Sequence, residues 1–154
     1  MGPLGQLYRS IKTRHTDCHG EEAKVERNDI NPWEWSKAFG FSQAVELTGA
    51  ERILICSGQT AIGPDGSPPS SSDMGEQVRT AVRNIVTVLE TAGMGSADVV
   101  KVDIYTTDVD DFLGVYGPEV QEVLGSNLPA STLVGVTRLA FPELKVEIEV
   151  VAAR

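Results

Sequence analysis

The sequence predicts an α+β fold in which one mixed β-sheet carries two helices packed on one face. Residues 145–151 alternate charged and aliphatic side chains, which is typical of a strand with one buried and one solvent-exposed face. Residues 73–92 carry apolar side chains at helical spacing. The segments follow the order strand, strand, helix, strand, helix, strand, strand, and the 154 residues suffice for one domain with its own core.

The composition is that of an ordinary globular protein, with 41% hydrophobic and 23% charged residues. The formal net charge of -9 repels phosphate backbones, so nucleic acid is not expected as a partner. No apolar run reaches membrane-spanning length, and the N-terminus lacks the apolar segment of a secretion signal, so no membrane partner is expected. The two cysteines, Cys18 and Cys56, do not form a disulfide framework. These features predict a cytoplasmic protein.

Residues 1–30 are expected to form a flexible tail, and residues 31–154 a single domain. Up to Asp29 the chain has no hydrophobic period and carries five side chains of each charge, so the net charge falls on the domain. Four residues of metal-ligand type stand close together in the tail: His15, Asp17, Cys18 and His19. A metal site usually takes ligands from a second element, and the chain has no second Cys/His cluster, so we expect no metal.

The first part of the domain is expected to form a β-hairpin. Residues 41–47 and 52–57 read as strands, and Gly49 between them gives a turn its conformational freedom. Both tryptophans, Trp33 and Trp35, precede this hairpin. Exposed tryptophan pairs are unfavourable, so we expect the segment to pack on the domain or on a neighbouring subunit, with ligand stacking as the alternative.

Capping residues and periodicity predict the remaining elements. Asp73 is expected to cap the first helix and Gly93 to end it, and a second helix is expected over residues 108–124. The other strands are expected at 99–107, 131–138 and 145–151. Two helices can cover only one face of the sheet. Leu133 and Val151 are expected on the other face, which self-association would cover most simply.

Several short motifs of the chain together resemble one known family. They are, in order, Gly40-Phe-Ser-Gln-Ala-Val45, Cys56-Ser-Gly-Gln59, the helix at 73–93, Val102-Asp-Ile-Tyr105, Pro129-Ala130 and Val146-Glu-Ile-Glu149. Each motif alone is weak, but their order and spacing are specific. On these motifs, residues 31–154 resemble the Rid/YjgF family, also labelled endoribonuclease L-PSP. The resemblance implies a chorismate-mutase-like fold and a homotrimer with small-molecule clefts between its subunits.

The resemblance also implies an activity. The best-known family members hydrolyse reactive enamines and imines, such as 2-aminoacrylate and 2-iminopropanoate, to keto acids and ammonia without a metal or organic cofactor. In their pattern an Arg follows Pro-Ala and binds the substrate carboxylate in a bidentate way. This chain has Ser131 at that position, and a hydroxyl cannot replace the charge of a guanidinium. The resemblance therefore implies a deaminase whose substrate specificity is altered or lost.

Other positions of the implied cleft also depart from the family pattern. Phe41 stands where the family often has Tyr, Leu133 where it often has Cys, and Tyr116 where it often has Asn, so the cleft is expected to be less polar. Arg138 is the other candidate for binding a carboxylate. It lies seven residues from Ser131, so strand alternation places it on the opposite face, and we do not expect it to replace the missing Arg within one subunit.

The retained positions of the pattern are Ser57, Gly58 and Glu147. Gly58 matches a residue whose backbone contacts the ligand, and Glu147 matches the acid that positions the attacking water. A carboxylate at this place can take a proton from water. The alternative is that Glu147 and Glu149, which share one face of the last strand, form salt bridges at a subunit interface.

Three functions are therefore open. The first is hydrolysis of an imine or enamine that lacks a carboxylate or carries it differently, with Glu147 handling the proton. The second is a non-catalytic trimer that holds a small, fairly apolar metabolite in its clefts. The third is ribonuclease activity, which ranks last because residues 31–154 contain no His and carry the whole net charge of -9.

Overall fold

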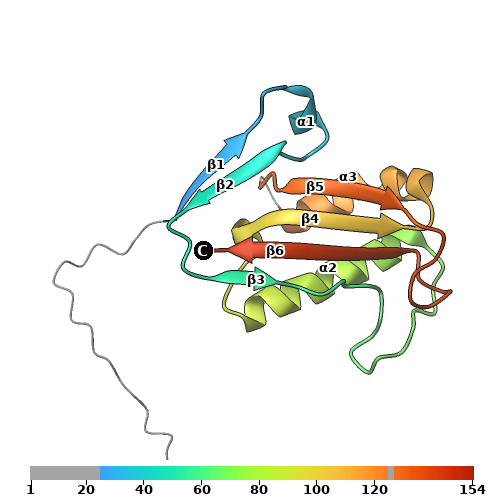
Figure 1. The fold of residues 1–154 in the computed structure, drawn as a ribbon. Helices are drawn as coiled ribbons and strands as arrows, with labels where there is room; N and C mark the ends of the chain where they lie inside the picture. The colour runs from blue at the N-terminus through green and yellow to red at the C-terminus, as the bar shows by residue number, and fades with distance from the viewer. Residues whose placement is uncertain (1–24, 125–126) are drawn as a thin grey trace, which may run out of the picture.

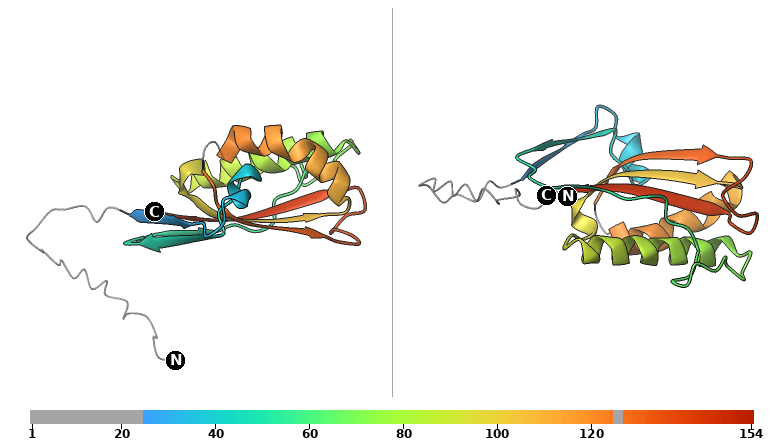
Figure 2. Two further views of the ribbon diagram at one scale, coloured as in Figure 1. Left: turned by 90° about the horizontal axis from the view of Figure 1, so that it is seen from above. Right: turned by 60° about the horizontal axis from the view of Figure 1, so that its bottom comes forward.

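The computed structural model describes residues 25–124 and 127–154, apart from the side chains at 116–119 and 121–124. The elements are β1 (Glu26–Ile30), α1 (Trp35–Ala38), β2 (Ala44–Thr48), β3 (Ile53–Ile55), α2 (Met74–Thr91), the short 3-10 helix η1 (Ser96–Asp98), β4 (Val99–Thr106), α3 (Val109–Leu124), β5 (Ala130–Gly135) and β6 (Val146–Ala153). Figure 1 shows a four-stranded sheet with the strand order β3-β6-β4-β5 and a smaller sheet of β1 and β2 beside it. Helices α2 and α3 lie on one face of the larger sheet (Figure 2). The predicted α+β class and the one-sided helical layer are confirmed.

The larger sheet is mixed because β6 runs antiparallel to both of its neighbours, β3 and β4, whereas β4 and β5 are parallel. Ile104 in the middle strand β4 lies opposite Ile148 in β6 on one side and Leu133 in β5 on the other. Strand alternation places these aliphatic side chains on the face that the helices cover.

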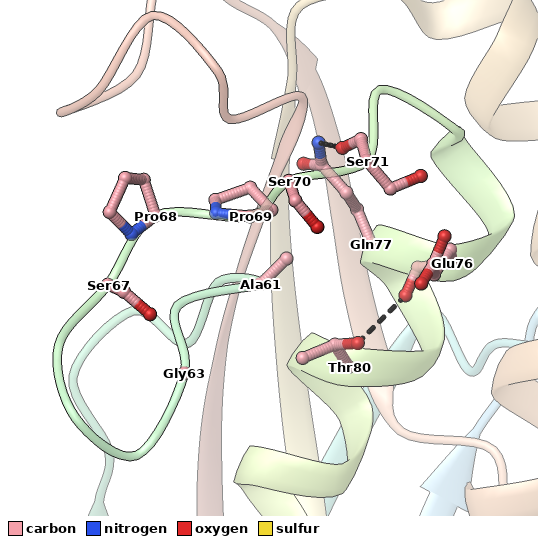
Figure 3. A pocket seen from close by; sticks show the side chains of 10 residues that line it. All are labelled: Ala61, Gly63, Ser67, Pro68, Pro69, Ser70, Ser71, Glu76, Gln77 and Thr80. Carbon is pink, nitrogen blue, oxygen red and sulfur yellow. Dashed lines mark hydrogen bonds between the residues drawn. The ribbon is translucent and has the colours of Figure 1, made fainter.

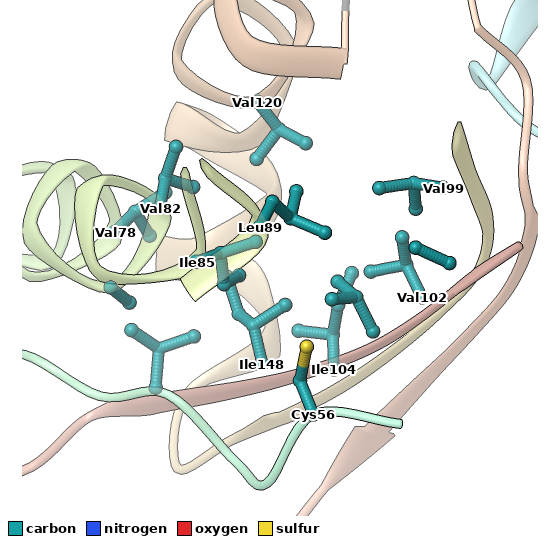
Figure 4. Packing of buried hydrophobic residues seen from close by; sticks show 14 of the residues in the cluster. Cys56, Val78, Val82, Ile85, Leu89, Val99, Val102, Ile104, Val120 and Ile148 are labelled. Carbon is teal, nitrogen blue, oxygen red and sulfur yellow. The ribbon is translucent and has the colours of Figure 1, made fainter. Parts of the chain in front are cut away.

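Helix α2 forms where its sequence predicts it. The Asp73 carboxylate accepts a hydrogen bond from the Glu76 backbone N–H at 2.7 Å, and Gly93 follows the helix with a φ of 69° that favours glycine. Its buried face packs with β4 and β6 into one core (Figure 4). Leu89 is 1% exposed there. Each fully buried aliphatic side chain of this kind stabilises the fold by about 1.5–3 kcal/mol.

The hairpin predicted over 41–47 and 52–57 is wrong. Strand β2 pairs with β1, from Glu26 opposite Thr48 to Ile30 opposite Ala44, and β3 pairs with β6 instead. The reason lies just after the turn: the backbone N–H groups at 51 and 52 both donate to the Arg154 carbonyl, at 3.0 and 2.8 Å. The C-terminal end of the chain therefore forms the backbone hydrogen bonds that a local hairpin with β2 would have needed.

The expected tail over residues 1–30 is also too long. Residues Glu26–Ile30 form strand β1, because β2 offers them a complete antiparallel ladder despite their polar composition. Residues 1–24 lie outside the described part of the chain, so the tail prediction for them is untested. The structured part of the chain begins at least five residues before the predicted domain boundary at residue 31.

Two contacts attach the small sheet to the edge of the large one. The Ser42 backbone N–H donates to the Pro129 carbonyl at 3.0 Å, beside the start of β5. The Arg27 guanidinium donates to the carbonyls of Val99 and Leu128, both at 3.0 Å. Together these contacts hold α1 and the segment around residue 41 next to β5 (Figure 1).

One predicted orientation in β5 needs correction. Leu133 was expected on the uncovered face, but it packs against the helix-covered core, because its parallel partner Ile104 points there. Ser131 lies two residues earlier on the same face. Val151 does lie on the uncovered face, since it follows the buried Val150 and is paired with Ile55, which is 77% exposed.

Candidate functional site

A cavity of about 300 Å³ lies between α1, β5 and the first turn of α3. We call it the aromatic cavity, and its lining residues are Trp35, Phe39, Phe41, Ile104, Phe112, Leu113, Ser131 and Leu133. Three predicted site residues, Phe41, Ser131 and Leu133, are therefore brought together. Tyr116 lies on the same helix as Phe112, and its side chain is outside the described residues.

The aromatic wall of the cavity is built by the segment before β2. The Trp35 ring meets Phe41 edge to face, with centroids 5.6 Å apart, and meets Phe39 in the same way at 6.1 Å. Asn31 holds this segment in place: its side-chain oxygen accepts from the buried Ser36 hydroxyl at 3.2 Å and from the Gln43 backbone N–H at 3.0 Å. This polar anchor positions aromatic rings that the hydrophobic core itself does not bury.

The tryptophan segment was expected to pack on the domain, and this holds only in part. Trp35 is 54% exposed although it lines the cavity, and Trp33 is 59% exposed and does not line it. The alternative, ligand stacking, agrees with the position of Trp35 beside the cavity, whereas Trp33 does not line this cavity. Large aromatic rings that are exposed beside a cavity leave apolar surface in contact with solvent, and a ligand or another subunit can cover it.

The chemistry of the aromatic cavity is almost entirely apolar. Ser131 supplies the one hydroxyl of its described lining, and none of the described residues forms a hydrogen bond with that hydroxyl. None of the described residues that line the cavity has a charged side chain. Arg138 lies beyond the end of β5, is exposed, and donates to the Ala140 carbonyl at 3.5 Å. It is therefore not among the residues that could neutralise a carboxylate in the cavity of the same copy of the chain.

Of the retained residues, Gly58 and Glu147 meet on the opposite, uncovered face of the sheet, and the exposed Ser57 precedes Gly58 in the chain. The segment at 57–59 is fixed to β6 by two backbone hydrogen bonds between Gln59 and Ile148, at 2.8 and 2.9 Å. A Cβ atom on Gly58 would stand only 1.8 Å from Oε1 of Glu147. The Glu147 carboxylate therefore occupies the space that any other residue at position 58 would need.

The surroundings of Glu147 leave its carboxylate available. It is half-buried and lies opposite Tyr105 in β4, while Glu149 lies opposite Asp103. No ion pair or hydrogen bond within the described residues engages the side chain of Glu147 or Glu149, whereas Asp103 is ion-paired with Lys101. Within the described residues of one copy these two glutamates have no salt-bridge partner, and the salt bridges considered for them at a subunit interface stay a prediction.

The predicted site residues thus fall into two groups on opposite faces of one sheet. Phe41, Ser131 and Leu133 face the helices, and Ser57, Gly58 and Glu147 face away from them. The two groups do not meet within a single chain. Any site that uses both must combine the helix-covered edge of one copy with the uncovered face of another.

Sequence reasoning missed most of the aromatic cavity. Phe39, Ile104, Phe112 and Leu113 were not predicted as site residues. Phe112 lies in the second helix, which was expected from the sequence, and is fully buried. The available signal was the density of aromatic residues around Phe41, where four rings fall within nine positions.

A second cavity, of about 220 Å³, lies under the loop at 61–72 beside the start of α2 (Figure 3). It contains none of the predicted site residues. Its buried amide, Gln77, is fully used: the side chain donates to the carbonyls of Ser71 and Glu143 at 2.8 and 2.9 Å and accepts from the Lys145 N–H at 2.8 Å. These bonds tie the loop to the body, so we interpret this cavity as structural.

Two broader expectations can be compared with the described residues. In that part of the chain no three His, Cys, Asp or Glu side chains are placed to hold a metal ion, and the cluster around His15 lies outside it. Neither α2 nor α3 is long and apolar enough to cross a membrane, within the same described residues.

Comparison with known proteins places these features in a family. The model of the family described as endoribonuclease L-PSP matches residues 34–154. The chain belongs to the Rid/YjgF family. The crystal structure of YyfB from Yersinia pestis, a Rid-family protein of unknown function, superimposes with a TM-score of 0.75 at 32% identity, covering 83% of this chain and 98% of that one.

Two curated relatives of this Rid-family chain bear on function and location. The 2-iminobutanoate/2-iminopropanoate deaminase of Escherichia coli is 32% identical over 117 residues, which cover 74% of this chain and 87% of the deaminase. A Schizosaccharomyces pombe protein named mmf2, mitochondrial, is 33% identical over 126 residues, covering 80% and 95% of the two chains. The family thus includes deaminases and mitochondrial proteins, and the cytoplasmic location of this chain stays a prediction.

Proposed function

We propose that this Rid-family protein hydrolyses a reactive imine or enamine to a carbonyl compound and ammonia, with a specificity that differs from that of deaminases carrying the clamping Arg. The observation that carries the proposal is the Glu147 carboxylate, which lies against the Gly58 backbone without a partner in the described residues. The deaminase name of the Escherichia coli relative supports the reaction class.

The reaction needs one proton-transferring carboxylate. Water attacks the carbon of the C=N bond, its proton passes to Glu147, and the π electrons move to nitrogen, which takes a proton. Glu147 supplies that proton from the one it accepted from water, which completes the carbinolamine. In the second step the carbinolamine hydroxyl gives its proton to Glu147 as the C=O bond forms, Glu147 passes this proton to the amino nitrogen, and the C–N bond breaks so that ammonia leaves. The balance of atoms requires only the imine and one water.

We propose further that the working site lies between copies of the chain in a homotrimer. The division of Ser131 and Glu147 over two faces of the sheet supports this, since one copy cannot bring them together. Exposed aliphatic side chains support it as well: Ile53 and Ile55 in β3 are 69% and 77% exposed on the face that carries Glu147. A contact between copies would remove these side chains from water.

A non-catalytic trimer that binds a small metabolite is the second candidate. One observation favours it, namely the absence of any charged side chain in the described lining of the aromatic cavity. A guanidinium fork is the usual means of fixing a carboxylate substrate for attack. Ribonuclease activity is not proposed, because the acidic domain offers no histidine for acid–base work on RNA.

Ammonia release from imines generated in situ tests the proposal. An amino acid oxidase supplies imines with a carboxylate, and an amine oxidase supplies imines without one. Wild type, Glu147→Ala and Ser131→Arg are compared, with light scattering to follow assembly. We expect wild type to accelerate ammonia release from a carboxylate-free imine and Glu147→Ala to lose about 100-fold or more with unchanged assembly.

Two results separate the candidates. In the first, wild type releases no ammonia from any imine while Ser131→Arg releases it from a carboxylate-bearing one. That result would mean that the cleft is intact and that the natural chain is a binding protein. If Glu147→Ala dissociates and retains its activity per folded chain, Glu147 has the structural role and the proposed mechanism is wrong.

A further inference from the structure

We infer that the aromatic cavity selects an uncharged ligand with a single aromatic ring, so that the substrate class of the proposed site is an aryl-substituted imine without a carboxylate. The inference rests on the proposed function for the reaction and on the lining of the cavity for the substrate. Trp35, Phe41 and Ser131 form the part of the site that would bind this ligand.

Size sets the first limit. The cavity measures about 300 Å³. An apolar protein cavity of about 150 Å³ is large enough to bind benzene. The aromatic cavity therefore accepts one ring with a short arm of a few atoms, and a much larger fused ring system would exceed its volume.

Ring geometry sets the second limit. Trp35 already meets Phe41 and Phe39 edge to face, at centroid distances of 5.6 and 6.1 Å. Aromatic pairs favour this arrangement and gain beyond simple area burial. Trp35 and Phe39 remain 54% and 66% exposed, so a bound ring would bury surface that the fold leaves in water. Such a wall prefers a flat ring to a branched aliphatic group.

Charge sets the third limit. A carboxylate placed in this cavity would meet no Lys, Arg or His in the described lining. The nearby Lys37 is held in an ion pair with Glu34 at 2.8 Å, and the Arg27 guanidinium is occupied by two backbone carbonyls and by Asp29. A buried charge without a partner is strongly disfavoured. The unbonded Ser131 hydroxyl can offer a neutral polar group one hydrogen bond.

Benzamide and benzoate provide a matched pair of probes, because they share one ring and nearly one shape and differ in charge. Their dissociation constants for the full chain are measured by ligand-observed NMR in wild type, Trp35→Ala, Trp33→Ala and Ser131→Arg. Trp33→Ala is the control, since Trp33 is similarly exposed on the same segment but does not line the cavity.

We expect wild type to bind benzamide at least tenfold more tightly than benzoate. Trp35→Ala should weaken benzamide binding at least tenfold, Trp33→Ala should change it by less than twofold, and Ser131→Arg should reverse the preference. Equal or tighter binding of benzoate to wild type overturns the inference, as does equal sensitivity to the two tryptophan substitutions or a failure of wild type to bind benzamide.

The binding and ammonia-release experiments test the ligand class of the cavity and the deaminase proposal independently. Selective benzamide binding without ammonia release from any imine would overturn the deaminase proposal and leave the ligand class of the cavity standing. Ammonia release from a carboxylate-bearing imine together with a failure to bind benzamide would overturn the ligand class and leave the deaminase proposal standing.

Discussion

The two faces of the four-stranded sheet differ in what completes them. On the covered face, Val102, Ile104 and Ile148 are each 2% exposed, because α2 and α3 pack against them and exclude water. On the uncovered face of the same strands, Tyr105 and Glu147 remain half-buried. Alternate residues of one strand therefore have two different roles. The residues that face the helices stabilise the monomer, and the residues on the uncovered face can contact a ligand or another copy of the chain.

The uncovered face is also chemically mixed. Exposed isoleucines from β3 lie on the same side as Glu147 and Glu149 of the neighbouring strand, and Lys101 is paired with Asp103 further along. A face of this kind is too apolar to be well solvated and too charged to serve as an interior. It therefore fits an interface between subunits, in which some carboxylates stay accessible.

The largest effect is expected in the covered face. Leu89→Ala removes a side chain that is 1% exposed in the middle of the core, so the free energy of unfolding should fall by about 2–5 kcal/mol. Urea denaturation at one fixed protein concentration measures it. Thr87→Ala, at an exposed position of the same helix, is the control and should stay within about 0.5 kcal/mol. A loss below about 1 kcal/mol in Leu89→Ala would contradict the core described here.

The next effect is expected at the contact between Gly58 and Glu147. Gly58→Ala places a Cβ atom 1.8 Å from Oε1 of Glu147, so the flexible carboxylate must swing away. Imine hydrolysis should fall about 100-fold while the fold persists, because general acid–base catalysis depends on position. Gly114→Ala is the matched control, since nothing lies within 4 Å of its new Cβ atom. Full activity in Gly58→Ala would exclude Glu147 as the catalytic carboxylate.

A charge on the uncovered face should affect assembly more than folding. Ile55 is 77% exposed in one chain, so Ile55→Glu should leave the unfolding of a monomer nearly unchanged. In an interface the new carboxylate would be buried without a partner, and self-association should weaken at least about tenfold. Sedimentation velocity over a concentration series measures this, with Thr87→Glu on the outer face of α2 as the control. An unchanged oligomeric state in Ile55→Glu would mean that this face is not the interface.

The smallest effect concerns the thiol in the covered core. Burial raises the pKa of the Cys56 thiol above its ordinary value of 9.0. The folded chain therefore holds this proton longer than the unfolded chain does. The stability that results is complete below pH 9.0 and falls as the pH rises through the folded pKa. The background for the measurement is Cys18→Ser, which leaves Cys56 as the remaining thiol.

In that background, alkylation at pH 8 should be about 100-fold slower in native protein than in urea. Native and urea-unfolded rates that agree within a factor of two would show that the core around Cys56 opens freely.

Prediction from the sequence worked where the signal is local. The cap at Asp73 and the alternation around Ile148 depend on neighbouring residues, and both elements stand where they were expected. It failed where partners are distant. The strand at Ile53–Ile55 pairs with the C-terminal β6 and not with the adjacent β2, although Gly49 between β2 and β3 has the positive φ of 76° that a turn can use. A local pattern specifies that a strand has an apolar face, and the free energy of the whole sheet decides which neighbour pairs with it.

The candidate site divides in the same way. The sequence by itself determined the family and the identities of the residues at the expected site positions, namely Ser131, Gly58 and Glu147. Only the tertiary structure decided that Ser131 and Glu147 lie on opposite faces, and that Trp35 and Phe112, 77 positions apart, line one cavity. The physical reason is that identity and periodicity are properties of short segments. The face that a strand presents, and the walls that it shares, are set by which distant side chains are buried together.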